Sequence, residues 1–506
     1  MLGRRGTQLA ALESRWTAPI GDWRSQLLWR AFGVAVNQLC VMLLPTEGLS
    51  REPVFIASYA SGLLLIALGP RLVLLLFSAI AQTGLLFHII SHPSYQLAEE
   101  YLPLAVLPSV GVLLCAIVGS ASNETRTRRI DCAQVALFRV TVVALMSFAA
   151  FHKLNADFFD PTVSCAMIVP HRLLPFLPGA DLIVRATPFL GFAGEALVPL
   201  LLIFYPRLGM ALTVVVMGTI GHRGATSFTI LVLLLSISFL RAGDRDPIRE
   251  FWRRNRFWIA AGCIGLGAAS FVVYQRFGTH RPWHEYLLFE LVLVAVSCSV
   301  LPLLYTTART EWAGLRACQR GADRRIWLAR VLRPGFSEDP ILGFGRGVDD
   351  GIGPRVRLLL VVLIGAAVLN AMTPYLGLKL RMSFAMFSNL RVDDDRWNHF
   401  LIPRALDLRR HDPYVHVTRV RRSGDASAGL ALEPGLYLPD ELDARLAAFR
   451  KRRVDVDIEF EYRGERRTHE HAQTDAELLS WIARRMGHNR WIHGHLVAGA
   501  PQPCLH

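Results

Sequence analysis

Long apolar runs alternate with short polar segments over the first three quarters of the chain. About 20 apolar residues are needed to cross the hydrocarbon core of a bilayer, and most of these runs approach that length. The pattern predicts a mostly α polytopic helix bundle with about eleven spans, or ten if the short run at 208–222 is re-entrant. The predicted spans are 27–45, 53–69, 72–91, 101–120, 133–152, 186–205, 208–222, 226–240, 257–274, 286–305 and 356–374.

The pattern changes after residue 375. Apolar and polar residues alternate at 414–420 and 454–462, which predicts two strands, and helical patterns follow at 439–451 and 474–486. These elements predict a small C-terminal α+β domain. The expected organisation is an interfacial arm at 1–25, a membrane core at 26–305, a basic loop at 306–355, a last transmembrane helix at 356–375 and the α+β domain at 376–506.

Arginine accounts for most of the formal net charge of +14. In a chain that is 52% hydrophobic, such residues are read as membrane-flanking groups, so the bilayer is the expected partner and nucleic acid is not. Basic segments occur in the N-terminal arm, at 126–129, at 241–256 and at 306–355. With eleven spans they all fall on one face. The positive-inside rule then predicts a multi-pass protein of a cell inner membrane with a cytoplasmic N-terminus and a non-cytoplasmic C-terminal domain.

The eight cysteines are scattered and form no C-x-x-C pair, so no metal site is predicted. Cys165 and Cys504 are expected on the same side of the membrane, where they could form a disulfide. The run Asp393–Asp395 lacks the spacing of a calcium loop and is interpreted as a solvated turn.

The end of the fifth predicted span carries the most distinctive chemistry. His152 and Lys153 fall at a membrane boundary, with Asn155 and Asp157 directly after them. Lysine occurs elsewhere only at 379 and 451. Unlike arginine, a lysine can lose its proton in suitable surroundings and act as a base. The alternative is that Lys153 is an anchor whose ammonium reaches up to the lipid headgroups.

Two further ionisable residues fall in or beside apolar runs. Glu195 lies inside a predicted span, where a carboxylate is costly and therefore suggests a functional partner, here Lys153 or His222. The alternative is a structural lock between Glu195 and Arg207 or Arg185. His222 lies at the end of the run 208–222 and is predicted at the same depth as Lys153. The proline-rich segment 154–185 between these elements is either a lid or an ordinary connector.

The stretch from Ala149 to Phe158, Ala-Ala-Phe-His-Lys-Leu-Asn-Ala-Asp-Phe, resembles the Ala-Gly-x-Lys-Lys-Leu-Asp-x-Asp-Trp segment of the vitamin K-dependent γ-glutamyl carboxylases. These belong to the wider bacterial HTTM-domain group of membrane proteins. In this resemblance Lys153 matches the proposed base that deprotonates reduced vitamin K, Asp157 is kept, and Asn155 replaces an aspartate. The signals at 386–390 and 398–399 are similar to a segment that follows the membrane domain in bacterial relatives.

The resemblance implies an enzyme with a quinol-type pocket on the non-cytoplasmic side. Lys153 would be its catalytic base, and His222 would orient the reacting groups or relay a proton. The supporting residues would be His152, Asn155, Asp157 and Glu195. The implied cofactor is reduced vitamin K or another isoprenoid quinol, and the substrate a peptide or small acid. The chain lacks the large lumenal domain of the carboxylases, so two alternatives stay open: a non-enzymatic binding, transport or assembly protein, and a quinone-linked redox partner.

Overall fold

A computed structural model gives the arrangement of the chain. It describes residues 17–43, 51–91, 100–118, 123–167, 180–222, 226–277, 283–319, 353–376, 388–391, 397–406, 414–423, 432, 434–485 and 495–496. The chain divides into two compact units. The first comprises 1–86, 100–147 and 193–366, and the second 87–99, 148–192 and 367–506.

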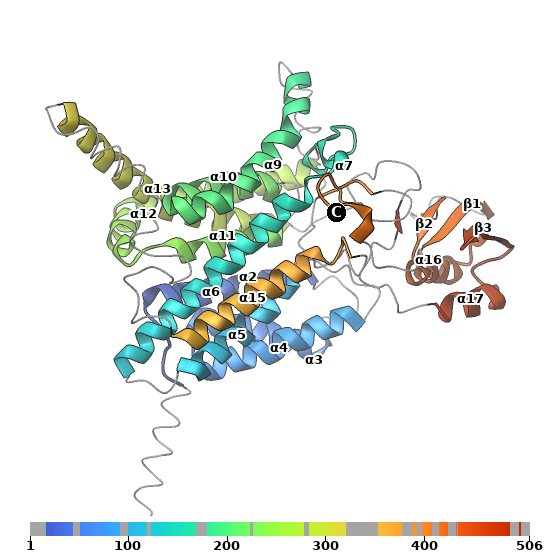
Figure 1. Ribbon diagram of the computed structural model, residues 1–506, viewed down its shortest axis with the longest axis horizontal. Coiled ribbons are helices and arrows are strands. Elements are labelled where there is room, and N and C mark those ends of the chain that lie inside the picture. Colours follow the sequence, from blue (N-terminus) through green and yellow to red (C-terminus); the bar gives the residue numbers. More distant parts are fainter. Residues whose placement is uncertain are drawn as a thin grey trace, which may run out of the picture. The chain divides into compact units, whose positions relative to one another are not determined.

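Each of the eleven apolar runs overlaps a helix (Figure 1). The helices are α2 (Trp23–Leu43), α3 (Pro53–Leu68), α4 (Leu72–Ser91), α5 (Tyr101–Val118), α6 (Asn123–His152), α9 (Ala180–Phe204), α10 (Pro206–His222), α11 (Thr226–Ser236), α12 (Arg245–Phe277), α13 (Trp283–Gln319) and α15 (Pro354–Met372).

Seven of these helices, in the part of the chain that is described, are long and apolar enough to cross a membrane: α2, α4, α5, α6, α9, α13 and α15. Their length and composition identify a membrane protein of mostly helical class. Three apolar helices, α3, α10 and α11, are shorter than the length of a full span. The predicted count of eleven spans is therefore not confirmed within the described residues, because an apolar run predicts a buried or lipid-facing helix without fixing its length.

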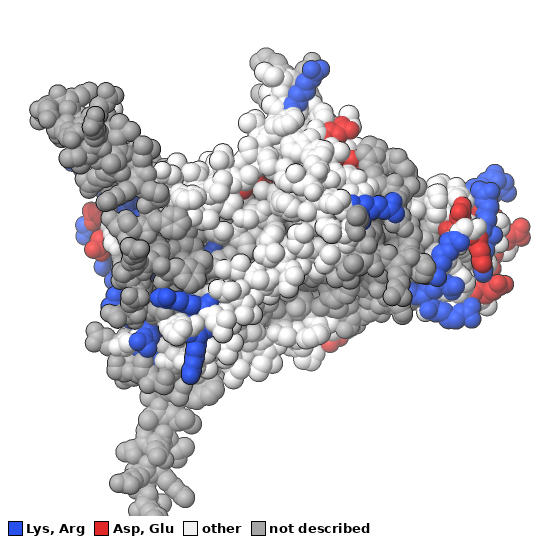
Figure 2. Space-filling model, viewed as in Figure 1, with Lys and Arg blue, Asp and Glu red and all other residues white. Residues whose placement is uncertain are grey.

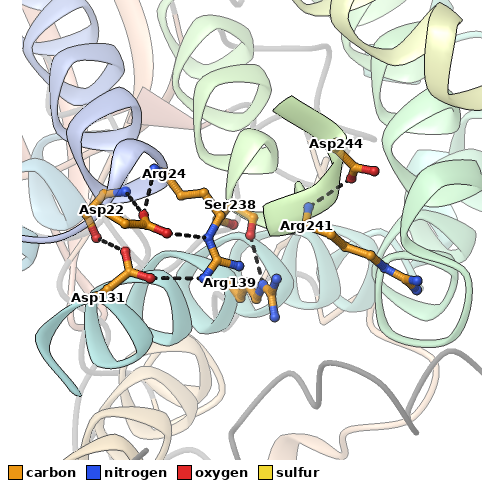
Figure 3. A network of polar contacts seen from close by, with 8 residues as sticks. Asp22, Arg24, Asp131, Arg139, Ser238, Arg241 and Asp244 are labelled. Carbon is orange, nitrogen blue, oxygen red and sulfur yellow. Dashed lines mark hydrogen bonds and ion pairs between the residues drawn. The ribbon is translucent and has the colours of Figure 1, made fainter. Parts of the chain in front are cut away.

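Figure 3 shows a network of hydrogen bonds and ion pairs in the first unit. Arg24 at the start of α2 binds the carboxylate of Asp131 on α6 at 2.9 Å. About two turns further along α6, Arg139 donates to the carbonyl of Ser238 at 2.8 Å. Burial raises the pKa of Asp22, but its hydrogen bond with Asp131, the charge of Arg24 and backbone N–H groups outweigh burial and lower the pKa overall. Asp22 therefore stays ionised beside Arg24.

The Arg24–Asp131 pair lies close to an aromatic core. Trp29 and Phe32 of α2 pack edge to face on Phe138 of α6, with ring centroids 5.0 Å and 6.4 Å from it. All three rings are almost completely buried. This packing fixes α2 against α6, the helix whose far end carries Lys153.

The C-terminal domain is a five-stranded antiparallel sheet in the order β4-β3-β1-β2-β5 with two helices. Its elements are β1 (Val415–Ser423), β2 (Gly435–Tyr437), α16 (Pro439–Arg452), β3 (Asp455–Tyr462), β4 (Glu465–His469), α17 (Ala476–Ala483) and β5 (His495–Leu496). The predicted strands and helices at 414–420, 439–451, 454–462 and 474–486 are confirmed, with boundaries that shift by a few residues.

Alternation along β3 places the two faces of the sheet in different surroundings. Val456, Ile458 and Phe460 are buried in one cluster with side chains of α16 and α17, so both helices cover the same face. The residues between them are acidic and pair across the sheet with arginines of β1, as in Arg421 opposite Asp457. Figure 2 accordingly shows charges of both signs gathered on the sheet domain and sparse along the described helices.

Candidate functional site

The turn after α6 is built from the residues that the sequence singled out. The N–H groups of Lys153 and Leu154 donate back to Ala150 and Phe151, which ends the helix in a tight turn. Asn155 then adopts an extended conformation and accepts from the N–H of Phe158 at 2.9 Å. Asparagine is a favoured N-cap residue because its side chain satisfies a helix N–H that has no partner within the helix. The short helix α7 (Ala156–Phe159) therefore begins here.

A segment from beyond the last membrane helix crosses this turn. His399 and Asn155 form an antiparallel bridge, in which Ala156 N–H donates to the Asn398 carbonyl at 3.0 Å. Phe400 N–H donates to the Leu154 carbonyl at 2.9 Å. In Figure 1 this segment is the orange trace beside α7. It brings together residues more than 240 positions apart in the sequence.

Three asparagines hold the crossing, and we call Asn155, Asn389 and Asn398 the asparagine clamp. Asn155 Nδ2 donates to the carbonyl of His152 at 2.7 Å and to that of Ser388. Its Oδ1 also accepts from Asn398 Nδ2 at 3.3 Å. All three side chains are at least nine-tenths buried, so the hydrogen bonds form away from water.

The other two asparagines extend the clamp. Asn398 Nδ2 also donates to the Asn389 carbonyl at 2.8 Å, and Asn398 Oδ1 accepts from the Arg391 N–H at 2.8 Å. Asn389 Oδ1 accepts from the N–H of Cys165 at 2.7 Å, and its Nδ2 donates to the Val163 carbonyl at 2.9 Å. Asn389 has a φ of 53°, in the left-handed region that asparagine tolerates better than most residues. The clamp thus spans both ends of the 154–165 segment.

Lys153 is covered by protein. Its side chain is 4% exposed, with Nζ 3.3 Å from the Ala149 carbonyl and 5.7 Å from the centre of the Phe158 ring. Asp157, in the first turn of α7, is 1% exposed. A lysine that anchors to headgroups would keep its ammonium at the surface, and this one does not.

His152 lies in an aromatic cluster beside Lys153. Its Nδ1 is 2.7 Å from the hydroxyl of Tyr375, three residues after the end of α15. The Tyr375 ring is fully buried and packs against the rings of Phe151 and His399, at 5.9 Å and 4.8 Å. Burial raises the pKa of Tyr375, so its hydroxyl keeps its proton.

The hydrogen bonds of His399 fix its tautomer. Nδ1 accepts from the N–H groups of Leu401 and Ile402 at 3.2 Å and 3.1 Å, and so carries no proton. Nε2 therefore holds the proton and donates to the Phe151 carbonyl at 3.1 Å. Burial lowers the pKa of His399, although the Phe151 carbonyl opposes that change. The neutral imidazole is the form that fits.

The two expected partners of Lys153, Glu195 and His222, belong to the first unit, whereas Lys153 belongs to the second. Glu195 lies in α9 and is 5% exposed. His222 ends α10, and its side chain lies outside the described residues. A link of both to Lys153 stays a prediction. Arg207, one suggested structural partner of Glu195, binds instead to Asp244 at 2.8 Å.

Several other features of the sequence lie wholly or partly outside the described residues. Asp393–Asp395 and Cys504 lie outside the described residues, as do the segments 322–332 and 343–352 of the basic loop. Cys165 is buried and takes part in a disulfide whose other half is also outside them. Within the described part of the chain, no three His, Cys, Asp or Glu side chains come together in an arrangement that could hold a metal.

Sequence reasoning did not find Tyr375 or the pairing of the three asparagines. The preference of asparagine for helix N-caps was a readable signal at Asn155. Contacts across more than 200 residues leave no trace in a single sequence. Comparisons of the chain with protein-family models, curated proteins and solved structures find no match.

Proposed function

We propose that this chain is an integral membrane enzyme in which Lys153 acts as a general base next to a quinol-type pocket. The burial of Lys153 at the end of a candidate membrane span carries this proposal. Most basic residues of the chain are arginines, yet the buried basic residue at this turn is a lysine, which can exchange a proton.

The surroundings of Lys153 suit a flat aromatic ligand. Phe158 lies below the ammonium, and His152 is surrounded by the rings of Phe148, Phe151 and Tyr375. A reduced quinone would supply a phenolic hydroxyl, a weak acid that a base can deprotonate. Lys153 would accept that proton, and His152 and Tyr375, hydrogen-bonded to each other, would hold the adjoining wall. By resemblance to the carboxylases, the second substrate would be a peptide or small acid.

The clamp favours a second candidate, a non-enzymatic binding, transport or assembly protein of the HTTM-like group. Both polar atoms of the Asn155 side chain are used in holding the chain together. In the carboxylase-like motif this position is an aspartate, so the change from Asp to Asn is compatible with a site kept for structure. The two candidates differ in whether a quinol is turned over.

The deciding experiment uses the full chain purified from membranes and reconstituted in lipid. Bound isoprenoid quinone is extracted and identified, and consumption of the matching quinol is then followed with oxygen and bicarbonate present. Lys153→Arg keeps the charge and removes the base, so quinol turnover should fall by about 10²–10⁴-fold. The control is Lys451→Arg on the exposed end of α16, which should be neutral.

Full activity of Lys153→Arg, with wild-type expression and hydrogen exchange, would remove the base from the proposal. Absence of quinol turnover in the wild-type protein, together with quinone-independent binding of a partner, would favour the non-enzymatic candidate.

We also propose that the site opens to the non-cytoplasmic side of a cell inner membrane. Two observations support this orientation: the basic segments of the sequence, and the disulfide at Cys165, which suits an oxidising compartment. A reporter enzyme that works only outside the cytoplasm should be active when it is fused after His506. Activity only of a reporter that works in the cytoplasm would reverse the orientation.

A further inference from the structure

The crossing segment ends in an exposed apolar turn, which we call the 400–406 tip. Phe400 is 59% exposed, Leu401 64% and Leu406 42%. Pro403 is also exposed. Two large apolar side chains that project together from a turn are unusual at a surface that faces water.

Several backbone N–H groups of the tip donate to acceptors within the protein. Phe400 N–H donates to the Leu154 carbonyl, and the N–H groups of Leu401 and Ile402 both donate to His399 Nδ1. Pro403 has no N–H. The Ile402 carbonyl accepts from Trp397 Nε1 at 2.7 Å. Satisfied backbone N–H groups are what insertion into lipid requires.

The tip is continuous with a lipid-facing helix surface. The Phe400 ring stacks on Phe159 with centroids 6.0 Å apart, and Phe159 in turn contacts Phe189 at 5.0 Å. Phe189 and its neighbour Leu190 lie on the candidate span α9 and are 59% and 69% exposed. A row of aromatic rings therefore joins the tip to a surface that the bilayer covers.

We infer that the 400–406 tip is an interfacial membrane anchor that inserts Phe400 and Leu401 into the lipid leaflet around α9. The exposed Arg404, which lies within the tip after Pro403, has the position of a cation that meets lipid phosphates. The occupant is thus the bilayer interface, because the tip adjoins a spanning helix. This anchor is independent of any catalytic role of Lys153.

Photo-crosslinking of the full chain tests the anchor. Phe400→p-benzoylphenylalanine, introduced by amber suppression, is reconstituted in vesicles of phosphatidylcholine and phosphatidylglycerol and irradiated. Lipid adducts are then counted by mass spectrometry. Leu369 on α15, which is 67% exposed on a candidate span, serves as the lipid-facing control. Arg466 on β4, whose side chain is 66% exposed, serves as the control for water.

We expect the adduct yield at 400 to match that at 369 and to exceed that at 466 several-fold. Leu401→p-benzoylphenylalanine should give the same result, and it leaves the ring contact between Phe400 and Phe159 intact if the first variant fails to fold. Yields at both tip positions as low as at 466 would overturn the anchor. Adducts to a second copy of the chain in place of lipid would also overturn it.

Discussion

Replacing Asn155 with alanine should release the crossing segment from the turn after α6. The side chain of Asn155 makes four hydrogen bonds, to the carbonyls of His152 and Ser388, the N–H of Phe158 and the amide of Asn398. A buried hydrogen bond contributes about 1 kcal/mol net, and a buried group left without a partner costs more, so the local free energy of opening should fall by about 3–5 kcal/mol.

Hydrogen exchange measured by mass spectrometry gives a direct readout of this loss. The amides of Ala156 and Phe400 bond across the crossing, and so exchange only when it opens. Since 1.4 kcal/mol corresponds to a factor of ten, their exchange should accelerate by roughly 10²–10⁴-fold. Amides in the sheet of the C-terminal domain should be unchanged and serve as the internal reference.

Two further variants separate the clamp from a general effect of mutation. Asn155→Asp keeps the acceptor for Phe158 N–H but turns an oxygen toward the carbonyls of His152 and Ser388, so it should open the crossing at least as much as alanine at neutral pH. Asp160→Asn, in the same segment, retains a side-chain acceptor for Thr162 and should change stability by less than about 0.5 kcal/mol. An Asn155→Ala protein whose amides at 156 and 400 accelerate less than tenfold would refute the clamp as the element that holds the crossing.

Three other predictions follow from contacts in the second unit. The pKa of His399 is lowered in the folded protein, so its contribution to stability is complete above about pH 6.5 and declines as the pH falls below that value. The protection factors of the 400–406 amides, corrected for the intrinsic exchange rate at each pH, should therefore fall on acidification, and His399→Gln should lose that dependence. Asp475 caps α17 and binds His469 at 2.7 Å, so Asp475→Ala should destabilise α17 by about 1–2 kcal/mol while Asp475→Asn keeps the cap, as seen in exchange of the α17 amides. Cys165 takes part in a disulfide and Cys504 is its expected partner, so Cys504→Ser should leave a thiol at Cys165 that is alkylated in the unfolded protein without reductant, and an unreactive Cys165 would assign the disulfide to another partner.

The sequence predicted elements whose signal is local. Apolar runs identified the helices because a lipid-facing or buried helix needs apolar residues along its length. The alternation of Val456, Ile458 and Phe460 identified β3 because successive side chains of a strand point to opposite faces. Neither pattern measures how far a helix extends into polar flanks. The predicted spans at 53–69 and 226–240 therefore correspond to helices α3 and α11, which are shorter than a typical span, while the run at 208–222, already short in the sequence, forms the short helix α10.

The candidate site was less predictable because it combines local and distant parts. His152, Lys153 and Asp157 were identified from charge at the end of an apolar run, and the structure finds all three buried at one turn. Asn155 was expected to support chemistry, and its hydrogen bonds hold the turn and the crossing segment together. Tyr375 carries no signal of its own, since only the folded chain brings its hydroxyl to His152.

The long separation between Asn155 and its partner Ser388, 233 residues, sets an order of assembly during synthesis. The turn after α6 leaves the ribosome first, with carbonyls and amide groups that have no partners until the crossing segment arrives. At about 5–20 residues per second, that interval is roughly 10–50 s. During this time several later helices, including α13 and α15, must be made and inserted. The Lys153 turn can therefore reach its closed form only after the last membrane helix is in place, which delays any activity of this site until the membrane domain is complete.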